Sequence, residues 1–247
     1  MKLFRNLRRK LVVFSKFKSY LIYAIGEVIL ITIGISIAWK INNWNDIRKD
    51  TIVERKIYMN LNEELHSNLR LLNRVIDEYP ERIKYLENTL NYVGKDEKDL
   101  SQGAKDTIVN LFDTDTNLIE NSVTSIVQTS KFELLESNDL KDLIILYPNK
   151  LVKFKEQNEN IKTLVNVKIK PIIEQYISLA DKLPNDNKYK TIKTYGSKSD
   201  YIGLLSNKKY QNAIIGWILQ IKKQLENAKT LRGKTKVLCT NLNEELN

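Results

Sequence analysis

The side chains best suited to chemistry are few and isolated in this chain. Its 247 residues include one histidine, His66, and one cysteine, Cys239. A Ser-His-Asp or Cys-His catalytic set needs partners that converge, and a metal site needs several His, Cys or carboxylate ligands. Glu63, three residues before His66, gives the only spacing that hints at paired ligands. A solvated helix face explains this pair better, so we predict no metal site.

The remaining reactive groups also give no indication of a catalytic site. Cys239 has no disulfide partner within the chain, and we interpret it as a packing residue, with a reactive or intermolecular thiol as the alternative. The adjacent acids Glu63–Glu64 and Glu244–Glu245 point in different directions from a helix, so we interpret both pairs as solvated surface. No GxxxxGK[ST], GxGxxG or HExxH motif is present. The sequence therefore predicts a non-catalytic protein that needs no cofactor.

One acid, Glu27, lies inside an apolar run at residues 20–41. A helix from Leu21 to Trp39 would extend roughly 28 Å, close to the hydrocarbon thickness of a bilayer. We therefore predict a transmembrane helix at 20–41. The alternative is a cleaved signal peptide, because Ser36-Ile37-Ala38 resembles a cleavage site. The run is longer than a typical signal core, however, and Trp39 would follow the cut.

Glu27, Gly34 and Ala38 fall on one face of this helix, because they are seven and four residues apart. Gly34 and Ala38 form a small-xxx-small pair, which lets two helices approach closely in lipid. We predict that the three residues form an association seam, in a homo-oligomer or with another membrane protein. Four roles stay open for Glu27: a protonated group bonded across a self-associated seam, a pairing residue for another membrane protein, part of an ion or proton path, or a lone acid that extends to the head groups.

Positive charge is concentrated before the helix. Seven Lys or Arg and no acid occupy the first twenty residues, so these carry +7 of the formal +10. Basic residues beside a span stay cytoplasmic and associate with anionic lipid. We therefore predict a cytoplasmic tail at 1–19, with head-group contacts from Arg5, Arg8, Arg9 and Lys10. The rest of the chain contains 33 basic and 30 acidic residues, which nearly balance. The pI of 9.4 therefore does not indicate nucleic-acid binding.

Aromatic residues mark both ends of the predicted span. Tyr20, Tyr23, Trp39 and Trp44 suit the aromatic belts at membrane interfaces. The flank after the helix has fewer basic residues than the tail, and acids dilute them. We therefore expect residues 42–247 on the far side of a bacterial cytoplasmic membrane, in the periplasm.

Past Trp44 the sequence favours helices throughout. Gly and Pro are scarce, at 8 and 4 residues, and no strand alternation is sustained. Apolar residues recur every three or four positions, the pattern of amphipathic helices. The predicted helices cover about 50–93, 103–112, 117–129, 138–183 and 207 onward, and the predicted loops cover 94–103 and 184–199.

Three prolines interrupt these stripes. We expect a kink at Pro80, where the stripe keeps its phase, and breaks near Pro148 and Pro171. Steps of seven over 69–93 resemble a coiled-coil seam. Helices with one apolar stripe each can bury it only by packing together. We therefore predict an all-α fold, with one N-terminal transmembrane helix followed by an extracytoplasmic bundle of long amphipathic helices at 42–247.

The run YAIGEVIL at 23–30, followed by Gly34-Ile35 and by INNWN at 41–45, resembles the N-terminal signature of a Bacteroidota family of single-pass membrane proteins of unknown function. That family also begins with a basic segment like FRNLR at 4–8 and keeps an acid at the position of Glu27. A block within 121–151 is similar to a second family segment. Thr129-Ser130 stands where the family often has Ser-Gly, and a glycine there would allow a positive φ. The resemblance implies a bacterial cytoplasmic membrane location and no particular activity.

Two functions are compatible with these patterns. The first is a membrane-anchored scaffold or sensor whose periplasmic bundle binds a protein or ligand and reports through one helix. The second is a subunit of a homo-oligomeric channel or transport assembly with Glu27 on the seam between helices. The expected partners are membrane lipid and either further copies or another membrane protein. A groove between bundle helices would favour the scaffold, and a pore along the Glu27 face would favour the channel.

Overall fold

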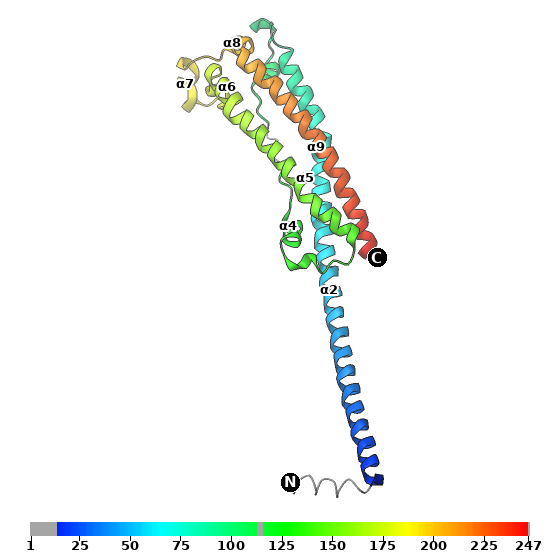
Figure 1. The fold of residues 1–247 in the computed structure, drawn as a ribbon. Coiled ribbons are helices and arrows are strands. Elements are labelled where there is room, and N and C mark those ends of the chain that lie inside the picture. The colour runs from blue at the N-terminus through cyan, green and yellow to red at the C-terminus, as the bar shows by residue number, and fades with distance from the viewer. Residues whose placement is uncertain (1–13, 113–115, 247) are drawn as a thin grey trace, which may run out of the picture. The chain divides into compact units, whose positions relative to one another are not determined.

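The computed structural model describes residues 14–112 and 116–246, with only the backbone described for 14–20 and Tyr23 (Figure 1). The protein is all-α: 84% of it is helical, and no described residue lies in a strand. The chain divides into two compact units, Met1–Arg55 and Lys56–Asn247. The all-α prediction is confirmed.

Helix α2, Phe14–Leu90, is a continuous helix of 77 residues. It therefore includes residues 42–49, which lie between the predicted transmembrane helix at 20–41 and the predicted helix at about 50–93. This stretch holds no Gly or Pro, and Asp46 accepts hydrogen bonds from Asn42 and Lys49 within the helix, at 3.2 Å each. The helix also continues through Pro80 and ends three residues before the predicted end at 93. A turn over 91–94 follows, where Gly94 adopts a φ of 83° that glycine tolerates without strain.

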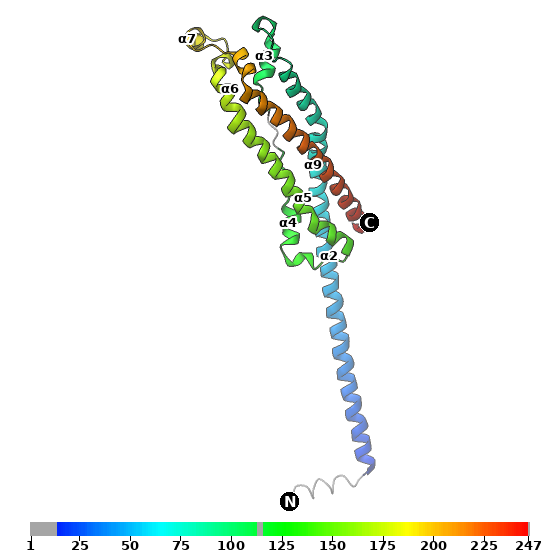
Figure 2. The same cartoon turned by 45° about the horizontal axis from the view of Figure 1, so that its top comes forward.

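The second unit contains the hydrophobic core. Helices α5 (Asn138–Thr163) and α9 (Lys208–Leu246) lie side by side in both views (Figures 1 and 2). They are antiparallel, because Tyr147 bonds to Thr235 and the Phe154 carbonyl accepts from Gln224. The 56–90 part of α2 adds its own stripe to this core. Its most buried apolar members are Leu61, Leu65, Leu72, Tyr79 and Leu86.

Trp217 lies at the centre of the α9 face and is fully buried. Its ring stacks on Phe112, with centroids 4.5 Å apart and an interplanar angle of 28°. Arg82 from α2 lies 5.3 Å from the Phe112 centroid, at cation–π distance. These contacts connect α2, α9 and the segment that follows α3.

Helices α3 (Gln102–Val109) and α4 (Asn121–Val127) are shorter than the predicted 103–112 and 117–129. Contacts from α2 explain the late start of α4. The Glu64 carboxylate accepts from the Ser122 and Val123 amides at 2.7 and 3.4 Å, and Asn68 bonds to the Ile119 backbone. Glu64 is 6% exposed, so its assignment to solvated surface is wrong. The Glu64 carboxylate, on α2, therefore caps the N-terminus of α4.

The predicted helix at 138–183 divides into four parts, the last of which is a short 3-10 turn, η4 (Leu179–Lys182), that follows a break after Tyr176. Helix α5 runs through Pro148 without a break, contrary to the prediction, because the flanking Tyr147 and Leu151 are both buried in the core. A π-helical segment, η3 (Leu164–Ile169), follows, and α6 (Lys170–Tyr176) begins with Pro171 in its first turn. Proline has no amide hydrogen to donate, and the π-helical segment directly before it accommodates the missing hydrogen bond. The break near Pro171 is therefore a widening of the helix rather than an end.

The predicted loop at 184–199 contains helix α7 (Lys190–Tyr195), which sequence periodicity over so short a span did not indicate. Helix α8 (Tyr201–Ser206) follows, with Asp200 accepting the Gly203 amide at 2.7 Å as its cap. At the η2 turn (Ser130–Phe132), Thr129 has a φ of −128°. No described non-glycine residue has a positive φ, so the Thr129-Ser130 turn needs no glycine.

Candidate functional site: a lysine-edged pocket between α5 and α9

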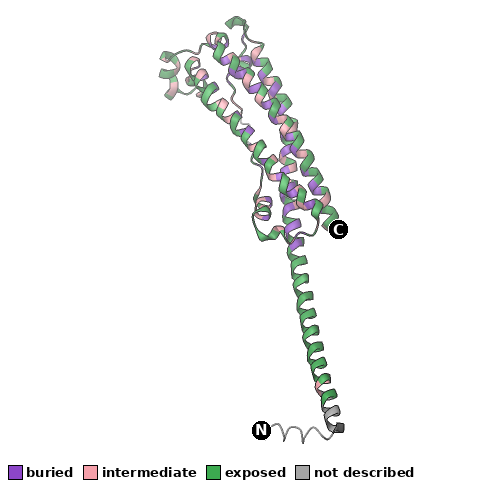
Figure 3. Ribbon diagram, in the orientation of Figure 1, coloured by how far each residue is buried: buried purple, intermediate pink, exposed green. Residues whose placement is uncertain are grey.

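The first unit contains the apolar helix that the sequence predicts. Within Ala24–Leu90, an 18-residue window has a mean hydropathy of 1.8, and none of that window is buried. Every residue from 27 to 44 is exposed, as the green ribbon of Figure 3 shows. This is one N-terminal helix that is long and apolar enough to span a membrane.

The predicted seam lies on this exposed helix. Glu27, Gly34 and Ala38 are all exposed, and a Cβ added at Gly34 would meet nothing within 4 Å. Trp39 and Trp44 are 69% and 70% exposed.

The other anchor residues are described less fully. Tyr20 and Tyr23 are helical, but their side chains lie outside the described part of the chain. The predicted head-group contacts Arg5, Arg8, Arg9 and Lys10 also lie outside the described residues.

The histidine and cysteine lie close together across the bundle. His66 is exposed, its Nδ1 is 2.9 Å from the Asn62 carbonyl oxygen, and the Cys239 Sγ is 3.8 Å from the same nitrogen. Burial raises the pKa of the Cys239 thiol to about 11. A protonated thiol is a poor nucleophile and a poor metal ligand. Among the described residues, no three His, Cys, Asp or Glu side chains gather in a way that could hold a metal ion.

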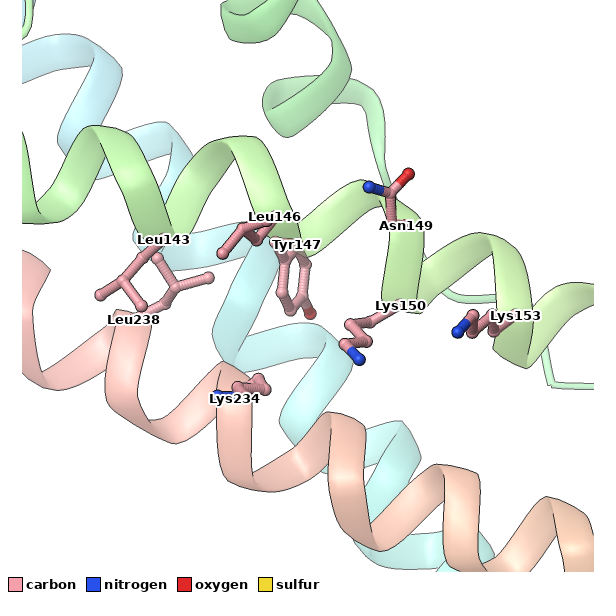
Figure 4. A pocket seen from close by; sticks show the side chains of 8 residues that line it. All are labelled: Leu143, Leu146, Tyr147, Asn149, Lys150, Lys153, Lys234 and Leu238. Carbon is pink, nitrogen blue, oxygen red and sulfur yellow. The ribbon is translucent and has the colours of Figure 1, made fainter.

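A pocket of about 410 Å³ lies between α5 and α9 (Figure 4). That volume lies in the range of small-molecule sites. Apolar and cationic side chains make up most of its lining. The lining residues are Leu143, Leu146, Tyr147, Asn149, Lys150 and Lys153 from α5, and Lys234 and Leu238 from α9.

The two kinds of side chain occupy different ends of the pocket. In Figure 4, Leu143 and Leu238 lie side by side at one end, and Lys150 and Lys153 lie toward the other. Lys234 projects from α9 opposite the Tyr147 ring. Leu146 is 60% exposed, which leaves an apolar surface at the edge of the pocket open to solvent. The pocket thus has an apolar end and a positively charged end.

Tyr147 forms a wall of the pocket and belongs to the core at the same time. Its hydroxyl lies 2.9 Å from the Thr235 Oγ1, and that hydroxyl donates to the Leu231 carbonyl at 2.8 Å. Because the Thr235 proton is used, Tyr147 donates its own proton to Thr235. Burial raises the pKa of Tyr147 to about 12. The Tyr147 phenol is therefore neutral, and its proton is used in the hydrogen bond to Thr235. The lysines are the cationic groups that a bound anion can contact.

None of these lysines was singled out from the sequence. Leu143, Leu146, Lys150 and Lys153 recur at helical spacing on a face beside the main stripe of Leu140, Ile144 and Leu151. Leu143 and Leu146, which lie beside the buried stripe, were the feature of the sequence that could have indicated the pocket. Lys234 could not have been added to the set, because its proximity depends on how α9 packs against α5 (Figure 4).

A second, more polar groove of about 870 Å³ runs beside the π-helical segment. Its lining includes Asn160, Lys168, Lys209, Asn212 and Gln220. Single-turn π segments occur frequently at functional sites. Leu164, Ile172 and Ala213 add apolar surface, but this groove has no aromatic side chain in its lining. The α5–α9 pocket, whose apolar and cationic side chains occupy different ends, is the stronger candidate.

No protein-family model matches the chain, and neither a curated protein nor a solved structure matches it.

Proposed function

We propose that this protein is a single-pass, membrane-anchored scaffold or sensor without catalytic activity, whose helical bundle binds a protein or a ligand. The observation that carries the proposal is the exposure of the apolar run, in which Leu30 is 72% and Ile35 is 65% exposed. A contiguous apolar surface of this kind marks contact with a membrane or a partner. The second unit, in contrast, buries its main apolar stripes in its own core.

We place the helix across a bacterial cytoplasmic membrane, with the N-terminus in the cytoplasm and residues 42–247 in the periplasm. The concentration of Lys and Arg before the helix supports this orientation. We also propose membership of the Bacteroidota family that has the YAIGE and INNWN signature. The agreement of residues 23–30 and 41–45 with that signature supports it.

The binding role is supported by the pocket between α5 and α9, which is the groove between bundle helices that a scaffold or sensor requires. The helical assignment of α2 from Phe14 to Leu90 supports a reporting role, since a helix can convey a shift or rotation.

The topology is tested with a Cys placed at the exposed Asn185 in a Cys239→Ser background. We expect a membrane-impermeant thiol reagent to label this variant in intact spheroplasts. An Asn6→Cys variant in the same background is the matched control and is expected to react only after lysis. Protection of Asn185→Cys before lysis, with labelling afterwards, would reverse the orientation. Extraction of the protein by alkaline carbonate would contradict the anchor itself.

The partner is tested by gentle purification of the tagged full-length protein from its native membrane. A stoichiometric second protein, or a bound small molecule, is the expected result for a scaffold or sensor. A homo-oligomer alone would favour the second candidate, a subunit of a channel or transport assembly. The observation that favours that candidate is an exposed acid, Glu27, on the same helix face as Gly34.

Self-association through this face is tested by Gly34→Leu. If Glu27, Gly34 and Ala38 form the seam, a leucine at Gly34 keeps the helices apart and reduces crosslinked oligomer. Ser36→Leu is the matched control, because Ser36 is exposed and lies on the opposite side of the helix, bonded only to its own helix at Thr32. Unchanged oligomer in Gly34→Leu would rule out the seam.

A further inference from the structure

The α5–α9 pocket combines an apolar end with a cationic end, and this combination selects a ligand class. We propose that the pocket binds an amphiphilic anion with a single aliphatic chain, with its head on Lys150, Lys153 and Lys234 and its chain against Leu143, Leu146 and Leu238. This inference rests on the proposed ligand-binding function of the bundle and names the ligand by its chemistry.

The order of side chains along α5 matches such a molecule. Leu143 and Lys150 are seven residues apart on one helix face, which separates them by about 10 Å along the axis. Leu238 extends the apolar end from α9, and Lys234 lies one turn away on the same helix, between Leu238 and the end that holds Lys150. The first several carbons of an aliphatic chain therefore fit between the ammonium groups and the apolar end, and the rest of a longer chain extends past the exposed Leu146.

The charge of the pocket is uncompensated. No carboxylate lines it, and Lys150, Lys153 and Lys234 form no ion pair with any described residue. On the same two helices, Lys155 contacts Glu120 at 2.7 Å and Lys222 contacts Glu87 at 3.1 Å. Three unpaired cations around one concave site attract an anion and repel a cationic ligand.

Tyr147 further restricts the class of ligand that the pocket can bind. Its proton is committed to Thr235, so it cannot donate to a ligand without breaking a buried hydrogen bond. An uncharged alcohol in this pocket would lack the attraction that the ammonium groups offer to a carboxylate or phosphate. Selectivity for an anionic head over a neutral head follows.

The dimensions favour a small molecule over a docked protein segment. α9 contributes one helical turn, Lys234–Leu238, to the lining. A docked amphipathic helix needs anchor positions over two turns or more of a groove. The volume of about 410 Å³ also lies toward the lower end of the range for small-ligand sites.

The test uses the full-length protein in nanodiscs of zwitterionic lipid and hexadecanoate that carries a photoactivatable diazirine. We expect saturable crosslinking to peptides that contain 143–153 or 234–238, displaced by unlabelled hexadecanoate and not by hexadecanol. Empty nanodiscs correct for partitioning of the probe into lipid. Lys150→Gln and Lys234→Gln are each expected to weaken binding about fivefold, the loss of one partly exposed ion pair.

Lys236→Gln is the matched control, because it removes the same charge from α9 at an exposed residue that does not line the pocket. It is expected to leave binding unchanged. An equal loss in Lys236→Gln would show an effect of net charge alone and overturn the assignment of the head group. Equal displacement by hexadecanol would overturn the anionic requirement.

Inorganic phosphate and butanoate distinguish the head from the chain. If either displaces the probe as well as hexadecanoate does, the pocket recognises a free anion and the amphiphile assignment is wrong. Crosslinks that map only to other helices would likewise refute the pocket. Carbonate extraction, cysteine labelling and co-purification do not depend on these lysines, so this inference can fail while the proposed anchor and scaffold stand.

Discussion

Asn68 and Ile119, which are 51 residues apart in sequence, exchange two hydrogen bonds. The Asn68 Nδ2 donates to the Ile119 carbonyl at 2.7 Å, and the Ile119 amide donates to the Asn68 Oδ1 at 2.8 Å. Asn68 is fully buried. A side-chain amide thus satisfies both polar groups of one backbone residue and fixes the segment before α4 against α2.

We predict that Asn68→Ala lowers the free energy of unfolding of the bundle by about 1–3 kcal/mol, because both Ile119 groups lose their partner. Thermal unfolding followed by circular dichroism gives the loss, and hydrogen exchange at the Ile119 amide locates it. Asn73→Ala is the matched control, since Asn73 is exposed on the same helix. Its effect should stay within about 0.5 kcal/mol. Unchanged exchange at Ile119 in Asn68→Ala would contradict the prediction.

We predict that the bundle loses stability at high pH, because the buried Tyr147 phenol must then lose its proton. Burial raises its pKa from 10.0 to about 12, so the folded chain holds the phenol proton more tightly than the unfolded chain. The resulting stabilisation is complete below pH 10 and is lost as the pH rises through about 12. Two pKa units correspond to about 2–3 kcal/mol.

Denaturant unfolding at pH 9 and near pH 12 measures this effect. Tyr147→Phe should be less stable than the parent at pH 9 and should lose less on going to the higher pH. Tyr195→Phe, at a site that is 84% exposed, serves as the control and should follow the parent. Parallel pH profiles for the parent and Tyr147→Phe would show that the phenol does not titrate as its burial requires.

Cys239 is predicted to be unreactive in the folded protein. Raising its pKa from 9.0 to about 11 lowers the thiolate fraction at pH 8 about a hundredfold, and the side chain is 5% exposed. A disulfide reagent should therefore modify the native protein more than about a hundredfold more slowly than the unfolded protein. Asn185→Cys in the Cys239→Ser background gives the rate of an exposed thiol. Comparable rates for the two native thiols would show that Cys239 is accessible.

Two glycines are predicted to respond in opposite directions to alanine. A Cβ at Gly233, within α9, would meet nothing within 4 Å, so Gly233→Ala should raise stability by about 0.5–1 kcal/mol. A Cβ at Gly203 would collide with the Asp200 carboxylate that caps α8, so Gly203→Ala should lower it. Melting temperatures of the two variants test both signs. A shift of the same sign in both would contradict the packing of α8.

The long helices of the bundle are readable from sequence because they bury continuous stripes. Leu61, Leu65 and Leu72 on α2, and Ile144, Leu151 and Phe154 on α5, recur at helical spacing and are all buried. The apolar run around Glu27 was equally readable, because hydropathy and length need no knowledge of packing.

What the sequence could not supply depends on contacts between distant residues. Glu64 has no local partner and is an ordinary surface acid by pattern, yet it caps a helix 58 residues away. Pro148 ordinarily interrupts a helix, but the buried neighbours Tyr147 and Leu151 keep α5 intact. The pocket needs Lys150 and Lys234 together, and only the antiparallel packing of α5 on α9 brings their backbones together.

The distribution of tryptophans gives the protein two separate sets of optical reporters. Trp39 and Trp44 lie exposed in the first unit, and Trp217, the third of the chain, is sealed in the core of the second against Phe112. Emission from the first pair responds to the medium around the apolar helix, whereas emission from Trp217 responds to melting of the bundle. A variant with Trp39 and Trp44 replaced by Phe reports folding of the bundle alone, and a Trp217→Phe variant reports insertion of the anchor alone, both without an added dye.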